Sequence, residues 1–181
     1  QHVTGFSKHY ILVEHNDVGL FKQLEGPKRV IVDEMDLFPK WIRAYPDPLY
    51  LFRRRIWLSL KTLPLRGWHA QQLRRIAIAE HVSEDALFYC DSDVAFMRDF
   101  DCASLWQGED LRLFRRDREL LGSLPGDQKL WADNAALLLG IPADRILPHG
   151  YVGTLIAWKR ELVVGMCRHI EQVQSKHWLE A

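Results

Sequence analysis

The sequence has few cysteines and no long apolar run. Its 181 residues include three cysteines, Cys90, Cys102 and Cys167, an odd number without a Cys-x-x-Cys pair. A disulfide framework or a zinc knuckle is therefore not expected, and a reducing cytoplasm is the simplest compartment. No stretch approaches the roughly 20 apolar residues that a membrane-spanning helix needs, so we expect no membrane span. The first residues also lack the basic and apolar pattern of a signal peptide.

The chain also lacks an excess of charge of either sign. Lysine and arginine together number 24, and so do aspartate and glutamate. Nucleic acids and anionic membranes both favour a basic excess, so this balance gives no reason to expect either as a partner. The length suits a single domain, 1–181, with a substantial core. We therefore expect a small-molecule partner.

Apolar strands alternate with amphipathic helices along the chain. This alternation, with short links, predicts an α/β sheet. The segment 36–64 is an exception, because four prolines interrupt it and aromatic residues are dense. A long connection of this kind usually is functional or folds over a site, although its aromatics can also simply anchor it to the core. The expected strands are 9–14, 28–33, 86–90, 110–114 and 154–158, and the expected helices are a short one capped by Asp17, then 67–82, 130–139 and 160–173.

The most informative local feature is an apolar strand that runs directly into two aspartates. Residues 86–90 (ALFYC) are followed by Asp91-Ser92-Asp93, and ligands of open α/β sheets collect beyond the carboxyl ends of strands. Carboxylate and phosphate oxygens are the hard ligands that Mg²⁺ and Mn²⁺ prefer. The pattern predicts a divalent metal at Asp91 and Asp93 that neutralises a diphosphate leaving group. The alternative is a turn in which the aspartates bind backbone N–H groups.

Other polar residues could complete such a site. Gln72 falls on or beside the buried face of the helix 67–82, where an amide needs partners. Arg75 could reach a diphosphate, or it could remain a solvated helix charge. His149 lies in a turn-rich segment and could add a neutral imidazole to a metal, unless it is a surface histidine. Asp133 is a possible general base, with an exposed or capping aspartate as the alternative.

Several segments together resemble one family of bacterial proteins. The resemblance is carried by Gly67-Trp68-His69-Ala70-Gln71-Gln72-Leu73, by the strand into Asp91-Ser92-Asp93-Val94, and by the stretches 96–101, 131–142, 151–159 and 177–178. It covers essentially the whole chain. The family is glycosyltransferase-like, of unknown function, and related to the GT-A enzymes.

The resemblance implies a GT-A-like fold, an open mixed sheet flanked by helices, with Mn²⁺ or Mg²⁺ and a nucleotide-sugar donor at the strand end. Arg75 stands where the family's Gln-Gln-x-x-Lys helix has lysine, so a planar fork replaces a point charge. The first β–α unit, which binds the nucleobase in GT-A enzymes, is not matched, and we expect it to be missing. The residues implied in donor binding are Gln71, Gln72, Arg75, Asp91 and Ser92.

Three functions fit this sequence. The first is a metal-dependent glycosyltransferase that moves a sugar from a nucleotide diphosphate to an acceptor hydroxyl, with the aromatic segment 41–57 as a wall for the acceptor. The second is a non-catalytic module that binds a sugar nucleotide or a carbohydrate. The third is a phosphatase of the haloacid dehalogenase type, which also places Asp-x-Asp after an apolar strand. Ala95 and the late position of the motif count against the third.

Overall fold

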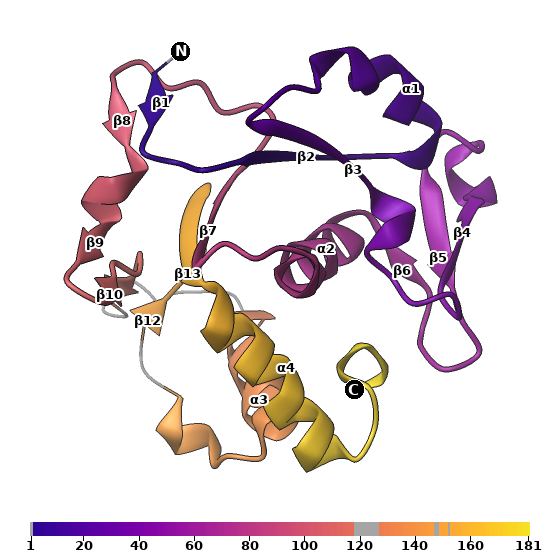
Figure 1. Ribbon diagram of the computed structural model, residues 1–181. Coiled ribbons are helices and arrows are strands. Elements are labelled where there is room, and N and C mark those ends of the chain that lie inside the picture. The colour runs from indigo at the N-terminus through magenta and orange to yellow at the C-terminus, as the bar shows by residue number, and fades with distance from the viewer. Residues whose placement is uncertain (1, 118–126, 147–148, 152) are drawn as a thin grey trace. The chain divides into compact units, whose positions relative to one another are not determined.

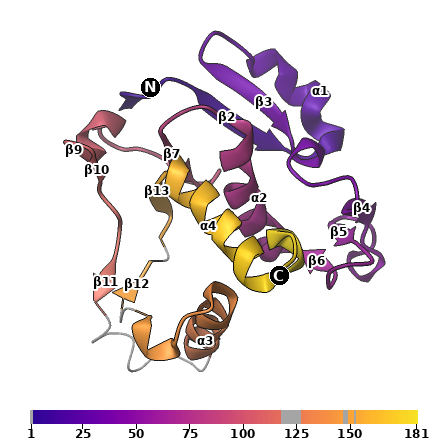
Figure 2. The ribbon, with the colours of Figure 1, turned by 60° about the horizontal axis from the view of Figure 1, so that its bottom comes forward.

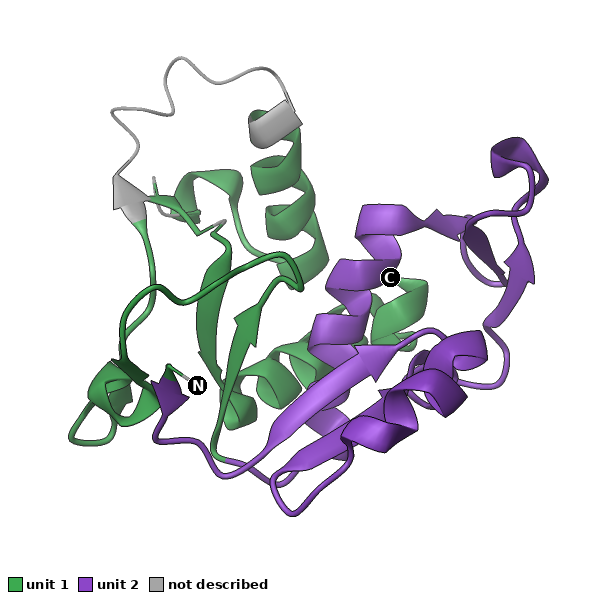
Figure 3. Ribbon diagram, turned by 90° about the horizontal axis from the view of Figure 1, so that it is seen from above, with its two compact units in different colours: residues 1–2, 85–181 green, residues 3–84 purple. Residues whose placement is uncertain are grey.

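The computed structural model describes residues 2–117, 127–146, 149–151 and 153–181, which fall into two compact units (Figures 1 and 3). We call residues 3–84 the N-terminal unit, and residues 85–181 together with His2 the C-terminal unit. Both strands and helices occur in each, so the chain is of mixed α/β class, with small sheets of two or three strands. The single domain expected from the length stays a prediction, and each unit is described by itself.

A parallel strand pair forms one part of the N-terminal unit. After β1 (Val3–Thr4), strand β2 (His9–Val13) pairs with β3 (Arg29–Asp33), with Val13 opposite Asp33. The predicted strand–helix–strand order is confirmed. Asp17 lies at the start of the short helix, but its side chain makes no capping hydrogen bond, so its predicted capping role is wrong. The connection consists of η1 (His15–Asp17), α1 (Val18–Phe21) and η2 (Lys22–Leu24).

A three-stranded antiparallel sheet occupies the segment that was expected to be irregular. Strands β4 (Arg43–Pro46), β5 (Arg55–Leu58) and β6 (Leu65–Arg66) pair in the order β4-β5-β6. Pro46 is tolerated because it ends an edge strand. Trp57 is buried and packs edge-on against Phe38, with ring centroids 4.9 Å apart. Trp57 therefore anchors the sheet to the core.

Helix α2 (Gly67–His81) follows β6 and confirms the predicted helix to within one residue. Gly67, at φ +44°, begins the helix in the left-handed region, where a side chain is rarely accommodated. The helix packs against β5 and β6. The buried residues of the helix are small or branched: Ala70, Ala77, Ile78 and Ala79.

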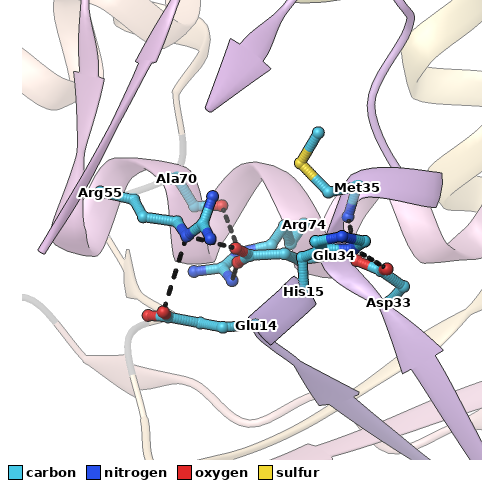
Figure 4. Close-up of polar contacts among 8 residues, drawn as sticks. All are labelled: Glu14, His15, Asp33, Glu34, Met35, Arg55, Ala70 and Arg74. Carbon is cyan, nitrogen blue, oxygen red and sulfur yellow. Dashed lines mark hydrogen bonds and ion pairs between the residues drawn. The ribbon is translucent and has the colours of Figure 1, made fainter. Parts of the chain in front are cut away.

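A buried ion-pair cluster joins the parallel strands to α2 and to β5 (Figure 4). Glu34, in η3 (Glu34–Asp36) directly after β3, is 1% exposed, and its Oε2 accepts a hydrogen bond from Arg74 Nη1 on α2. Arg55 Nε lies 4.0 Å from Glu34 Oε1 and 3.8 Å from Glu14 Oε2. Burial raises the pKa of the Glu34 carboxyl, and the Arg74 charge only partly opposes this rise.

A second buried carboxylate holds the loop between β4 and β5. Asp47 is fully buried, and its Oδ2 accepts a hydrogen bond from Arg66 Nε at 2.6 Å. Its Oδ1 accepts another from Leu49 N at 3.0 Å, which caps η4 (Pro48–Tyr50). The hydrogen bond from Arg66 lowers the pKa of Asp47, opposite to the shift at Glu34.

The C-terminal unit is built on an antiparallel strand pair. Strand β7 (Ala86–Cys90) pairs with β13 (Leu155–Lys159), with Cys90 opposite Leu155, and α4 (Arg160–Gln174) follows β13 directly (Figures 1 and 2). These three elements confirm the predicted ones to within one residue. The inner stripe of α4 is Val163, Cys167 and Ile170, all buried.

Side chains of α4 complete the end of helix α3 (Asp127–Leu139). The last carbonyls of a helix lack partners within it, and Gln174 Nε2 donates to the carbonyl oxygens of Leu137 and Leu138 at 3.0 Å. His169 Nε2 lies 2.9 Å from Leu139 O. Gly140, at φ +64°, then ends the helix as the predicted stop.

The remaining strands of the C-terminal unit are short. The strand predicted for 110–114 is wrong beyond its first two residues, because only β10 (Asp110–Leu111) pairs, with β9 (Trp106–Gln107). Of the described helices, none has the length and apolar character to cross a membrane. The other short elements are β8 (Phe100–Asp101), η5 (Cys102–Leu105), β11 (Arg116–Asp117), η7 (Ala143–Arg145), β12 (His149–Gly150) and η8 (Trp178–Glu180).

Replacing Glu34 by glutamine tests the buried cluster. Because the pKa of Glu34 is raised on folding, the folded protein binds more protons than the unfolded chain above pH 4.5, its ordinary pKa. The contribution of Glu34 to stability is therefore full below that pH and declines as the pH rises through the raised pKa. In urea unfolding over a pH series, the stability of wild type relative to Glu34→Gln should fall with rising pH. Glu80→Gln, at an exposed carboxylate of α2, is the control, and a flat or rising difference for Glu34→Gln would contradict the assignment.

Replacing Asp47 by asparagine should give the opposite pH dependence. Arg66 lowers the pKa of Asp47 on folding, so its stabilising contribution is present above pH 3.8, its ordinary pKa, and is lost as the pH falls through the lowered value. The stability of wild type relative to Asp47→Asn should therefore increase as the pH rises from this acid range. The same urea series measures it, with the exposed Asp17→Asn as control. An equal difference at all pH values would show that the Arg66 contact does not favour the ionised carboxylate.

Replacing Gly140 by alanine should destabilise the contact between α3 and α4. A Cβ at this position would lie 2.7 Å from Val173 Cγ1, on backbone with φ +64°. We expect a loss of about 1–2 kcal/mol from the left-handed backbone alone. Gly165→Ala, within α4 and with no atom near its Cβ, should instead gain roughly 0.5–1 kcal/mol from helix propensity. Thermal unfolding compares the Tm of the two variants with that of wild type. Equal changes in Tm for Gly140→Ala and Gly165→Ala would contradict the close approach at Gly140.

Candidate functional site

The two aspartates of the predicted metal site lie where the chain leaves β7. The strand ends at Cys90, and Val94 N donates a hydrogen bond to Asp91 O at 3.2 Å, which closes a turn over 91–94. Asp91 is half-buried, whereas Ser92 and Asp93 are exposed. The strand end therefore presents carboxylate and hydroxyl oxygens at the carboxyl end of a strand, as the sequence predicted.

Aromatic rings support the segment that follows this turn. Phe88 of β7 stacks on Phe100 with ring centroids 5.3 Å apart, and Phe96 lies 5.7 Å from Phe100. Such pairs add to the free energy gained from burial alone. Burial and then the Asp101 carboxylate raise the pKa of the Cys102 thiol, with a smaller effect from Cys90. The turn at 91–94 is thus followed by a packed segment.

The helix residues implied in donor binding lie on α2, in the N-terminal unit. Gln72 and Arg75 are half-buried, in agreement with the predicted position of Gln72 beside the buried face, and Gln71 is exposed. Gln71 and Arg75 are four residues apart and so are neighbours on the helix surface. Asp91, Ser92 and Asp93 belong instead to the C-terminal unit.

The other two predicted residues lie on different elements of the C-terminal unit. His149 is half-buried in β12, opposite Asp117, with its ring edge-on to Tyr151 at 6.3 Å. Asp133 on α3 is 47% exposed, and its Oδ2 lies 3.5 Å from Lys129 Nζ in a pair spaced i, i+4. This is the exposed aspartate of the alternative interpretation, and its role as a general base stays a prediction.

Few protein ligands are available for a metal at this strand end. Within the described ranges, no group of three or more histidine, cysteine, aspartate or glutamate residues is placed to hold a metal. Mg²⁺ sites commonly use one or two carboxylates together with substrate phosphates and water. Asp91 and Asp93 would supply only this smaller set, and their role as metal ligands stays a prediction.

A second polar cluster, which the sequence analysis missed, lies where β2 and β3 end. His15 Nδ1 lies 2.5 Å from Asp33 Oδ2, and Asp33 Oδ1 accepts a hydrogen bond from Met35 N at 2.9 Å (Figure 4). The His15 side chain is 60% exposed and that of Asp33 is 17% exposed, so the pair lies at the surface. The sequence did contain a sign of this cluster, because both apolar strands run into acidic residues. Glu14 follows β2, Asp33 ends β3, and Glu34 follows it.

An open hollow of about 440 Å³ also lies in the N-terminal unit. It includes Tyr45, from the aromatic segment proposed as an acceptor wall, whereas Trp57 of that segment is buried in the core. Part of the segment therefore anchors the sheet and part borders the hollow. Its lining consists of Met35, Phe38, Lys40, Ile42, Arg43, Ala44 and Tyr45.

Comparison with known proteins identifies a family. A family model described as "Family of unknown function (DUF6492)" matches residues 1–181. No curated protein and no solved structure matches the chain. Since the match spans every residue, the chain belongs to DUF6492, a family whose function is unknown.

Proposed function

We propose that this chain is a metal-dependent glycosyltransferase of GT-A-like architecture, acting in the cytoplasm. The observation that carries the proposal is the turn at 91–94, which places Asp91, Ser92 and Asp93 directly after the strand β7. Ligands of open α/β folds bind beyond the carboxyl ends of strands. The resemblance of the GWxxQQ helix and of the Asp-Ser-Asp-Val strand end to glycosyltransferase-like proteins supports the same function.

Asp91 and Asp93 would hold Mn²⁺ or Mg²⁺, with His149 as a further candidate ligand. When bound, such an ion supplies Lewis-acid stabilisation of a diphosphate leaving group. The protein's own contribution is the backbone turn that carries both aspartates, followed by a segment in which Phe96 packs near Phe100.

Further residues would bind and orient the nucleotide-sugar donor. Ser92 offers an exposed hydroxyl in the turn, and Gln71, Gln72 and Arg75 offer amide and guanidinium donors, which suit diphosphate oxygens. The acceptor hydroxyl attacks the anomeric carbon of the sugar, the bond to the diphosphate breaks, and the hydroxyl proton passes to a base. Asp133 is the proposed base.

Thermal unfolding with metal and donor tests the role of Asp93. We expect Mn²⁺ together with one of a panel of UDP-, GDP- and CMP-linked sugars to raise the Tm, and neither the donor without metal nor the Asp93→Ala variant with both to show the rise. At a donor concentration 100 times Kd, binding adds about 2.7 kcal/mol. For a chain of this size that is a rise of roughly 5–10 °C.

The exposed Asp144→Ala is the matched control, because it also removes one surface carboxylate from the C-terminal unit. It should keep the shift. A shift that survives Asp93→Ala would contradict the assigned role of Asp93. Binding without transfer or hydrolysis of any donor would instead favour the non-catalytic module, and Mg²⁺-dependent turnover of p-nitrophenyl phosphate would favour the phosphatase.

A further inference from the structure

The loop between β4 and β5 exposes an unusual run of apolar side chains. Leu49, Tyr50, Leu51 and Phe52 are 75%, 46%, 77% and 68% exposed, and Arg53 and Arg54 follow them directly. We call residues 49–54 the hairpin tip (Figure 1). Contiguous exposed apolar residues with a polar rim mark interaction sites far more often than scattered single residues do.

The backbone of the hairpin tip is held in one conformation by its own hydrogen bonds. Phe52 N donates to Asp47 O at 3.0 Å, Arg53 N donates to Tyr50 O at 3.0 Å, and Asp47 N donates to Arg54 O at 2.7 Å. The buried Asp47 carboxylate and Arg66 anchor the base of the loop. The apolar side chains are therefore displayed on an ordered support.

Folding of this chain does not account for the residues at the tip. Leu51 and Phe52 have φ values of 51° and 60°, in the left-handed region that glycine and asparagine adopt at lower cost. Their exposed side chains also gain little from burial. Polar or small residues would suit the loop better, so neither backbone conformation nor burial explains why these side chains are apolar.

Charge around the tip indicates the chemistry of that contact. Residues 37–79 contain nine lysines and arginines and one acidic residue, Asp47, a net charge of +8 in a chain of zero net charge. Three of these cations have carboxylate partners, because Arg66 binds Asp47 and both Arg55 and Arg74 face Glu34. Arg53 and Arg54 directly follow the apolar residues of the tip. Overall balance conceals this segregation, which is why composition gave no reason to expect an anionic surface as a partner.

We propose that the hairpin tip inserts into the interface of a membrane rich in anionic phospholipid, with Arg53 and Arg54 on lipid phosphates. Apolar tips of this kind enter the headgroup and acyl boundary, and nearby basic residues add attraction to anionic lipid. The leucines argue against nucleic acid, because bases stack on aromatic rings and gain little from aliphatic side chains. A tip of four apolar residues is also much smaller than the 20–30 residues per side that stable protein interfaces use, which is about 800 Å² for each partner.

Cosedimentation of the full chain with vesicles tests the proposal. We expect binding to vesicles of phosphatidylcholine with about one third phosphatidylglycerol at low salt, weakening as salt screens the charges. Leu51→Asn with Phe52→Asn removes the apolar side chains while keeping residues that tolerate φ > 0. This variant should partition at least about tenfold more weakly.

Two further variants make the outcome decisive. Leu60→Asn with Leu63→Asn removes two leucines that are even more exposed, 107% and 84%, from the loop between β5 and β6, and it should bind like wild type. Arg53→Gln with Arg54→Gln should lose about tenfold for anionic vesicles only. Wild-type protein that stays in the supernatant, or a Leu51/Phe52 variant that binds as well as wild type, would overturn the proposal. Loss of self-association in that variant without vesicle binding would overturn it in favour of a protein contact.

Discussion

One buried carboxylate connects most of the N-terminal unit. Glu34 follows β3, receives a hydrogen bond from Arg74 on α2, and lies within ion-pair distance of Arg55 on β5. Removing a charge from water is costly, and the two guanidinium groups offset that cost only if strand, helix and second sheet keep this arrangement. Arg74 of α2 therefore faces Glu34, which ties this face of the helix to the end of β3.

The two buried carboxylates of this unit solve the same problem differently. Asp47 accepts hydrogen bonds from Arg66 and from a backbone N–H, which favour its ionised form. At Glu34 the effect of burial is larger than that of its partners, so the neutral form is favoured relative to an exposed glutamate. Asp47 therefore suits a permanent support for the hairpin tip, whose apolar side chains are exposed. The proposed transferase chemistry at Asp91 and Asp93 and the proposed surface contact at the tip rest on separate observations.

Elements with a strong local pattern were predictable, and short ones were not. The apolar runs of β2, β3 and β7 and the periodic faces of α2 and α4 appear in the structure within about a residue of their predicted bounds. The sheet β4-β5-β6 was missed because its strands have only two to four residues and prolines lie nearby. Such short strands show too little alternation of apolar and polar residues to be recognised from the sequence. The strand predicted for 110–114 failed for the converse reason. Alternation specifies two faces, but a strand also needs a paired neighbour, and the described strand ends at Leu111.

The sequence by itself determined the mixed α/β class and the apolar strand β7 that runs into Asp91, because each follows from residues adjacent in the chain. Only the tertiary structure decided that Arg74 meets Glu34, 40 positions away, and that Arg66 meets Asp47. It also decided that Leu51 and Phe52 face solvent while the equally apolar Trp57 is buried. The type of a side chain limits what it can bind. Whether it is buried and which residue it pairs with depend on contacts between distant parts of the chain, and the spacing of neighbouring residues does not predict these.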